Sequence, residues 1–147
     1  MHSAPRPRFH LAVEVDDLAA ARWFYGRVLG CAEGRSSERW VDFDLYGHQL
    51  VAHLGSSSHG SSGARDRTSN PVDGDEVPIP HFGVLLDPGR WRALADRLVA
   101  AGTDFVVEPR TRFVGQPGEQ STMFLRDPAG NALEFKAFAD DGQVFAV

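Results

Sequence analysis

Residues 81–87 of the chain read His-Phe-Gly-Val-Leu-Leu-Asp, and residues 10–16 read His-Leu-Ala-Val-Glu-Val-Asp, which is nearly the same pattern. The two stretches share their histidine, one valine and their aspartate at an offset of 71 residues (81 − 10). Each is followed by a short amphipathic run that ends in a glycine, at residues 17–30 and 88–102. A repeat of this kind indicates a duplicated structural unit, and we therefore interpret each half of the chain by comparison with the other.

The overall composition is that of an ordinary globular protein. The chain has 147 residues, of which 42% are hydrophobic and 24% charged, so neither disorder nor a membrane span is favoured. A net charge of −5 with scattered arginines argues against a nucleic-acid partner. The single cysteine, Cys31, cannot form a disulfide within the chain, and residues 1–9 lack the apolar core of a signal peptide. We therefore predict a cytoplasmic protein with no membrane or nucleic-acid partner.

Periodicity predicts a strand, a helix and further strands in each half. The second half is the clearer one, because Asp87 and Pro88 are typical of a helix start and residues 127–131 (Asp-Pro-Ala-Gly-Asn) of a turn. Between the halves, residues 55–70 are rich in Gly and Ser and predict a flexible loop. The predicted strands are 9–15, 40–45, 49–54, 81–87, 104–108, 121–126 and 132–138, and the predicted helices are 17–30 and 88–102.

These elements predict an α+β fold with four segments. A first βαβββ module spans 8–55, a Gly/Ser-rich linker 56–80, a second βαβββ module 81–138, and a C-terminal tail 139–147. Within the first module, residues 33–39 are expected to form a polar bend. In the second module, residues 109–120 are expected to form a long loop, and residues 71–80 an extended approach to it.

Four polar side chains are candidates for a metal site. His10 and His81 occupy the same position of the two repeats, each at the head of an otherwise apolar strand. Glu134 lies inside the apolar run 132–135, and aligning residues 50–54 with 131–135 makes His53 its counterpart in the first half. A single histidine on a strand is usually just exposed or hydrogen-bonded. Two imidazoles and a carboxylate in such strands would be costly to bury alone, and a cation offsets that cost.

Two motifs give the chain a family resemblance. Residues 24–30 read Phe-Tyr-Gly-Arg-Val-Leu-Gly, and residues 127–134 read Asp-Pro-Ala-Gly-Asn-Ala-Leu-Glu. Together with His10 and His81, these motifs resemble the vicinal oxygen chelate superfamily, which contains glyoxalases, bleomycin resistance proteins and type I extradiol dioxygenases, over about residues 8–138. The resemblance implies paired βαβββ modules that form a cupped, mostly antiparallel half-barrel sheet with helices outside. It also implies a divalent metal inside the cup and, often, a homodimer.

The resemblance leaves three functions open. Extradiol dioxygenases hold Fe(II) with two histidines and one carboxylate, a set that His10, His81 and Glu134 match, and they use a further histidine as acid and base, which would suit His53. We therefore favour a metal-dependent, dioxygenase-like enzyme with Fe(II) or Mn(II), acting on a small vicinal diol, enediol or catechol. A glyoxalase-type lyase or isomerase with Ni(II) or Zn(II) is the first alternative, although it needs a second carboxylate where the alignment gives His53. A non-catalytic protein that binds a small molecule, as drug-resistance proteins do, is the second.

Overall fold

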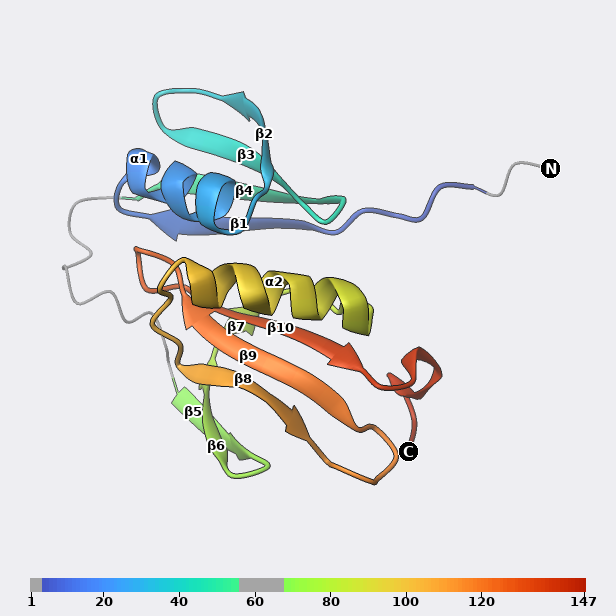
Figure 1. Cartoon of the computed structure of the whole chain (residues 1–147). Coiled ribbons are helices and arrows are strands. Elements are labelled where there is room, and N and C mark those ends of the chain that lie inside the picture. Colours follow the sequence, from blue (N-terminus) through green and yellow to red (C-terminus); the bar gives the residue numbers. More distant parts are fainter. Residues whose placement is uncertain (1–3, 56–67) are drawn as a thin grey trace. The chain divides into compact units, whose positions relative to one another are not determined.

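The structure, a computed structural model, describes residues 4–55 and 68–147 and divides into two compact units, residues 1–60 and 61–147. Each unit is described by itself below (Figure 1). No helix in the described ranges is both long and apolar enough to span a membrane.

The first unit is a four-stranded sheet with one helical segment. Its sheet has the order β1-β4-β3-β2, in which β1 and β4 are parallel and the other neighbours antiparallel. The elements follow the chain as β1 (His10–Val15), α1 (Leu18–Ala21), the π-helical η1 (Arg22–Val28), β2 (Ala32–Ser36), β3 (Trp40–Leu45) and β4 (His48–Leu54).

The helical segment of this unit begins and ends as the sequence predicts. The Asp17 carboxylate accepts hydrogen bonds from the backbone N–H groups of Ala19 and Ala20 at 2.8 and 3.2 Å, which satisfies two donors of the first turn. Gly30 follows the last turn with φ 79°, a left-handed conformation that glycine adopts without strain. The buried side of the unit combines Phe24, Tyr25, Val28, Val41, Phe43 and Leu50.

The second unit repeats this arrangement and adds a hairpin before it. The hairpin consists of β5 (Thr68–Val72) and β6 (Asp75–Ile79), and the main sheet has the order β7-β10-β9-β8. Its elements are β7 (His81–Phe82), α2 (Pro88–Ala100), β8 (Val107–Arg112), β9 (Gln120–Arg126) and β10 (Ala132–Phe138), followed by the 3₁₀ helix η2 (Asp141–Gln143). Here too the first and last strands are parallel and the other neighbours antiparallel.

The identical strand order in both units confirms the α+β fold and the βαβββ repeat. Both sheets place the first strand beside the last, which requires the intervening helix to cross one face of the sheet. In the second unit α2 does so, with Trp91 donating its indole N–H to the Phe135 carbonyl oxygen at 2.8 Å (Figure 1).

Four predictions about secondary structure were wrong. The strand predicted at 81–87 is formed only at its start, as β7. Residues 33–39 were expected to form a polar bend, but 33–36 belong to the edge strand β2. All residues of β2 are exposed, so its sequence carries no apolar alternation that would predict a strand. The strand predicted at 104–108 runs instead from Val107 to Arg112, into the expected loop. Residues 68–79, assigned to the linker, form the β5–β6 hairpin, whose Asp73-Gly74 turn supplies the signal that was overlooked. Residues 56–67 of that linker lie outside the described part of the chain.

Alternation along β9 and β10 gives the second sheet two distinct faces. Met123, Leu125, Leu133 and Phe135 are fully buried, while the opposite face carries Thr122, Phe124, Glu134 and Lys136, and we call it the site face. The hairpin packs on the site face, since Val77 forms a buried cluster with Phe124 and Val107.

Candidate functional site

The turn before β10 sets the position of Glu134. The buried carboxylate of Asp127 accepts hydrogen bonds from the backbone N–H groups of Ala129 and Asn131 at 2.9 and 2.8 Å, and from the Asn131 side-chain amide at 2.8 Å. Gly130 has φ 91°, which fits the reversal of the chain. The motif at 127–131 is therefore a rigid turn that delivers β10 in a fixed register.

Close packing of the backbone brings His81 beside β10. In the parallel ladder, His81 lies opposite Ala132 and Phe82 opposite Leu133. A Cβ atom on Gly83 would lie only 1.5 Å from the Glu134 carbonyl oxygen, so only glycine allows the chain to pass this close. Gly83 thus holds the strand of His81 against the strand of Glu134.

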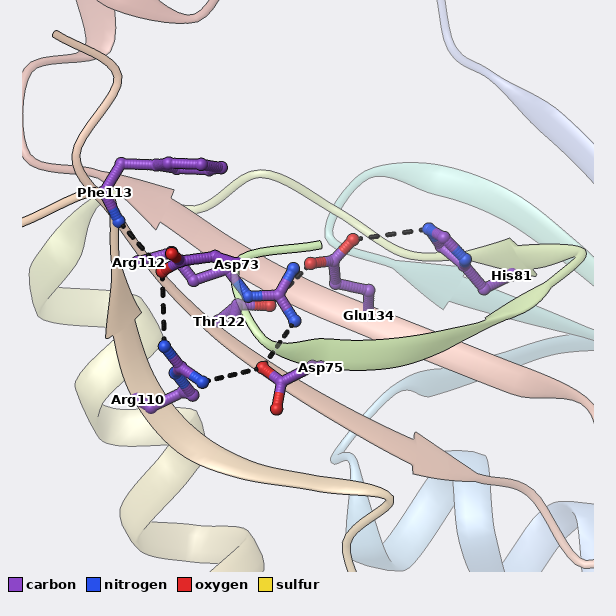
Figure 2. A network of polar contacts seen from close by, with 8 residues as sticks. All are labelled: Asp73, Asp75, His81, Arg110, Arg112, Phe113, Thr122 and Glu134. Atoms are coloured by element: carbon purple, nitrogen blue, oxygen red, sulfur yellow. Dashed lines mark hydrogen bonds and ion pairs between the residues drawn. The ribbon is translucent and has the colours of Figure 1, made fainter. Parts of the chain in front are cut away.

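His81 and Glu134 point toward each other on the site face (Figure 2). The His81 Nε2 atom is 3.3 Å from Glu134 Oε1, and the Thr122 hydroxyl donates to Glu134 Oε2 at 2.5 Å. The edge of the His81 ring packs against Phe124 with 4.9 Å between ring centroids. The two side chains are 29% and 10% exposed, so the pair is partly shielded from solvent.

The partners of the His81 ring determine its tautomer. The Nδ1 atom lies 2.7 Å from the Pro78 carbonyl oxygen, which can only accept, so Nδ1 carries a proton. In a neutral ring, Nε2 is then an unprotonated acceptor that faces a carboxylate oxygen, which is also an acceptor. Such an arrangement requires either a proton shared between the two atoms or a metal cation.

In the metal-free pair, the pKa values of both groups are shifted toward their charged forms. The hydrogen bond with Glu134 raises the pKa of His81 above its ordinary value, although burial opposes this. Burial by itself would raise the pKa of Glu134, but the hydrogen bonds from His81 and Thr122 outweigh it and leave that pKa lowered. Both shifts favour an imidazolium–carboxylate ion pair.

The same geometry fits two ligands of one metal ion. Two ligand atoms about 2.1 Å from an ion, at angles of about 90–110°, lie roughly 3.0–3.4 Å apart. The observed 3.3 Å between Nε2 and Oε1 falls in that range. The outer contacts also fit, because a metal-binding histidine normally donates its other N–H to a carbonyl or carboxylate, as His81 does to Pro78. Within residues 4–55 and 68–147, no group of three or more His, Cys, Asp or Glu side chains gathers around one point.

The hairpin is fastened to the site face by a charged network (Figure 2). Asp75 accepts hydrogen bonds from Arg110 and Arg112, both at 3.0 Å, and Asp73 accepts from Arg110 and from the Phe113 backbone N–H, both at 3.2 Å. The Arg112 side chain is only 3% exposed, and its guanidinium carbon lies 5.7 Å from the centre of the Phe124 ring. The hairpin therefore supplies both the Pro78 carbonyl and the charges that hold it in place.

The first unit orients His10 in a comparable way. The His10 Nδ1 atom is 2.8 Å from Gln49 Oε1, and the Gln49 amide nitrogen donates to Asp42 at 3.4 Å. This second contact fixes the amide orientation, so Gln49 Oε1 accepts and His10 Nδ1 donates. Like His81, His10 has its Nδ1 atom engaged, which leaves Nε2 available as a ligand atom.

The strand registers give His53 a different counterpart from the one that the sequence alignment suggested. His10 lies opposite Gln49, and His81 opposite Ala132, so Gln49 corresponds to Ala132. Counting two residues further, Glu134 corresponds to Val51, and His53 to Lys136. His53 is exposed and lies opposite Glu14 and Trp40 in the ladder, and its acid–base role stays a prediction from the sequence.

Two contributors to the site were missed in the sequence. Thr122 is fully buried and bonds the carboxylate of Glu134, and Pro78 supplies the partner of His81 Nδ1. Thr122 was detectable in principle, because it shares alternation with Phe124 on the strand that precedes the turn. Pro78 was not, because its role depends on a hairpin that the sequence analysis assigned to the linker.

Comparisons with known proteins agree with the fold. The family model of the Glyoxalase/Bleomycin resistance protein/Dioxygenase superfamily matches residues 9–135. A crystal structure titled glyoxalase/bleomycin resistance protein/dioxygenase from Alicyclobacillus acidocaldarius is 32% identical, with a TM-score of 0.77 over 98% of this chain and 100% of that one. No curated protein matches the chain.

More distant solved structures share the fold alone. Lactoylglutathione lyase from Agrobacterium tumefaciens is 23% identical with a TM-score of 0.63, covering 99% of this chain and 100% of its own. The fosfomycin resistance protein FosX from Listeria monocytogenes is 17% identical with a TM-score of 0.63, covering 97% of this chain and 100% of its own.

Proposed function

Because the chain belongs to the glyoxalase/bleomycin resistance protein/dioxygenase superfamily, we propose that it is a small divalent-metal-dependent enzyme of the extradiol dioxygenase type. Its substrate is a vicinal diol, an enediol or a catechol whose two oxygens chelate the metal. Superfamily members include dioxygenases and lactoylglutathione lyase, bind small molecules and commonly use divalent metals.

One observation carries the proposal, namely the approach of His81 Nε2 to Glu134 Oε1 at 3.3 Å with Nδ1 committed to Pro78. An imidazole acceptor and a carboxylate at this separation are suited to share a cation. The exposed fractions of 29% and 10% leave both side chains in part accessible to a ligand.

The available ligand set favours the dioxygenase type over the glyoxalase type. The third ligand predicted from the sequence is His10, whose Nδ1 is oriented by Gln49 and Asp42 as described above. The position that corresponds to Glu134 in the first unit holds Val51, so it offers no second carboxylate. Two histidines and one carboxylate are the typical set for non-haem Fe(II) oxygenases, and Mn(II) accepts the same donors.

The residues of the second unit have distinct proposed roles. His81 and Glu134 would hold the metal, which when bound would polarise the chelated oxygens and, as Fe(II), would mediate electron transfer from the chelated diol to dioxygen. Thr122 keeps the Glu134 carboxylate in one orientation through its 2.5 Å hydrogen bond. Phe124 covers one side of the pair and excludes water from it. His53 remains the predicted acid–base residue, because an imidazole titrates near neutral pH.

Metal loading followed by an activity survey tests the proposal. The protein is loaded anaerobically with Fe(II) or Mn(II), its metal content is measured, and oxygen uptake is followed with a panel of catechols. We expect one metal per chain and turnover of at least one catechol. His81→Ala and Glu134→Gln should each lower metal affinity by at least about tenfold, since each removes one ligand. His48→Ala is the matched control, because the His48 ring accepts a hydrogen bond from the Phe9 backbone N–H and is not among the proposed ligands.

Three further results would assign the protein elsewhere. A fully metal-loaded protein that consumes no oxygen with any catechol contradicts the oxygenase proposal. Turnover of the methylglyoxal thiohemiacetal with Ni(II) or Zn(II) would favour the glyoxalase alternative. Tight binding of a small molecule that is unchanged in His81→Ala would indicate a non-catalytic binding protein. Sedimentation of the wild-type chain checks the predicted homodimer separately.

A further inference from the structure

Lys136 adds a positive charge to the site face of β10. Arg110 and Arg112 are committed to the hairpin through Asp73 and Asp75. Lys136 is partly buried and, among the described residues, forms no ion pair. Its ammonium nitrogen lies 5.7 Å from the centre of the Phe138 ring.

Lys136 is also distinctive in the sequence. It is the only lysine in a chain that otherwise uses arginine for all its cationic side chains. A lysine ammonium is a compact, strongly hydrated charge, and partial burial without a carboxylate is unfavourable unless something else supplies the counter-charge.

Its position relates Lys136 to the proposed metal site. Lys136 follows Glu134 by two residues on β10, so both side chains project from the site face, about 6.8 Å apart along the strand. In the ladder it lies opposite Thr122, which bonds Glu134. Its charge is near enough to influence both members of the His81–Glu134 pair.

We propose that Lys136 binds a carboxylate-type anionic group of the ligand. The ligand of this site would then be a vicinal diol or catechol that also carries an anionic oxygen group, displaced from the chelating oxygens toward the Phe138 end of β10. The chelating part of this inference depends on the function proposed above, whereas the anion site does not. The corresponding position in the first unit holds His53, a second side chain able to contact a ligand at that level of its own sheet.

A matched pair of probes tests the assignment. 3,4-Dihydroxybenzoate and 4-methylcatechol share the diol and differ in the carboxylate, and their affinities for the Mn(II)-loaded protein are measured by calorimetry. We expect wild type to prefer the carboxylate probe by about tenfold, a typical effect for one partly buried charge pair. In protein fully loaded with Mn(II), Lys136→Met should abolish the preference for the carboxylate probe, and Lys136→Arg should retain most of it.

A second measurement does not require the metal. Because Lys136 is the only lysine, acetylation with an N-hydroxysuccinimide ester followed by mass spectrometry reports on this side chain apart from the chain terminus. We expect 3,4-dihydroxybenzoate, but not 4-methylcatechol, to protect Lys136. Protection in a protein that binds no metal would refute the metal-dependent function and leave the anion site standing. Equal affinities of the two probes for wild type, or a preference that survives Lys136→Met, would overturn the anion site.

Discussion

Replacing Gly83 by alanine should separate His81 from Glu134. A Cβ atom at this position would lie 1.5 Å from the Glu134 carbonyl oxygen and 2.6 Å from its carbonyl carbon, whereas ordinary contacts begin near 3.4 Å. The obstacle is backbone and cannot rotate away, so the two chain segments must move apart by about 1.9 Å (3.4 − 1.5). If the strands separate along the line that joins them, the distance between His81 Nε2 and Glu134 Oε1 would increase from 3.3 Å to about 5 Å.

That separation exceeds what one metal ion can bridge. Two ligand atoms at about 2.1 Å from an ion can be at most about 4.2 Å apart. Gly83→Ala should therefore lower metal affinity about as much as His81→Ala does. It should also lower the free energy of unfolding by about 1–3 kcal/mol, the usual cost of overpacking, or about 3–10 °C in melting temperature.

Circular dichroism melting and Mn(II) titration followed by electron paramagnetic resonance measure the two effects. Gly26→Ala is the matched control, because a Cβ at Gly26 would meet only the Cys31 carbonyl oxygen, at 4.0 Å. We expect this control to match wild type in metal affinity and to be at least as stable. A folded Gly83→Ala protein that keeps wild-type metal affinity would refute the view that close passage of the backbone holds the pair together.

Three further predictions concern the same face. In the metal-free protein, His81→Ala should reduce stability most between about pH 4.5 and 6.5, measured by urea unfolding across pH. The pKa of Glu134 is lowered in the folded protein, so the stability that Glu134 contributes is lost as the pH falls below the ordinary value of 4.5. The pKa of His81 is raised, so the stability that His81 contributes is lost as the pH rises above the ordinary value of 6.5. Thr122→Val should weaken Mn(II) binding by about tenfold, measured by titration, because Glu134 loses an orienting hydrogen bond. Asp75→Asn should reduce the free energy of unfolding, measured in urea, by about 2–3 kcal/mol, because Arg112 loses the carboxylate that accepts its hydrogen bond. An unchanged urea midpoint of unfolding would contradict this prediction.

The repeat made the fold predictable from the sequence. His10 and His81 mark the starts of β1 and β7, and the turn at 127–131 marks the start of β10, because these signals are local to the chain. The edge strand β2 was missed because it is exposed on both faces, so its sequence shows no alternation of apolar and polar residues. The hairpin was missed because its segment is short, polar and adjacent to a Gly/Ser-rich stretch, which resembles a linker.

The candidate site was predictable only in part, for a different reason. His81 and Glu134 could be identified because each interrupts an apolar pattern in a strand, and the structure brings their side chains together. Aligning short segments by sequence similarity made His53 the counterpart of Glu134 in the first repeat. The strand pairing shows that the residue at the corresponding position is Val51. Register depends on which residues share hydrogen bonds across the sheet, and a five-residue alignment carries no such information.

The two units differ in how each orients its histidine, and the hairpin explains the difference. In the first unit, hydrogen bonds from His10 to Gln49 and from Gln49 to Asp42 orient the His10 ring. The corresponding positions of the second unit hold Ala132 and Phe124, which cannot make these bonds.

The second unit can have apolar residues there because Pro78, at the end of the hairpin, accepts the His81 Nδ1 proton instead. An apolar surrounding strengthens the interaction of His81 and Glu134 with each other or with a cation. On the function proposed above, the hairpin would orient a metal ligand as well as cover the sheet, and Asp75→Asn should cost metal affinity in addition to stability.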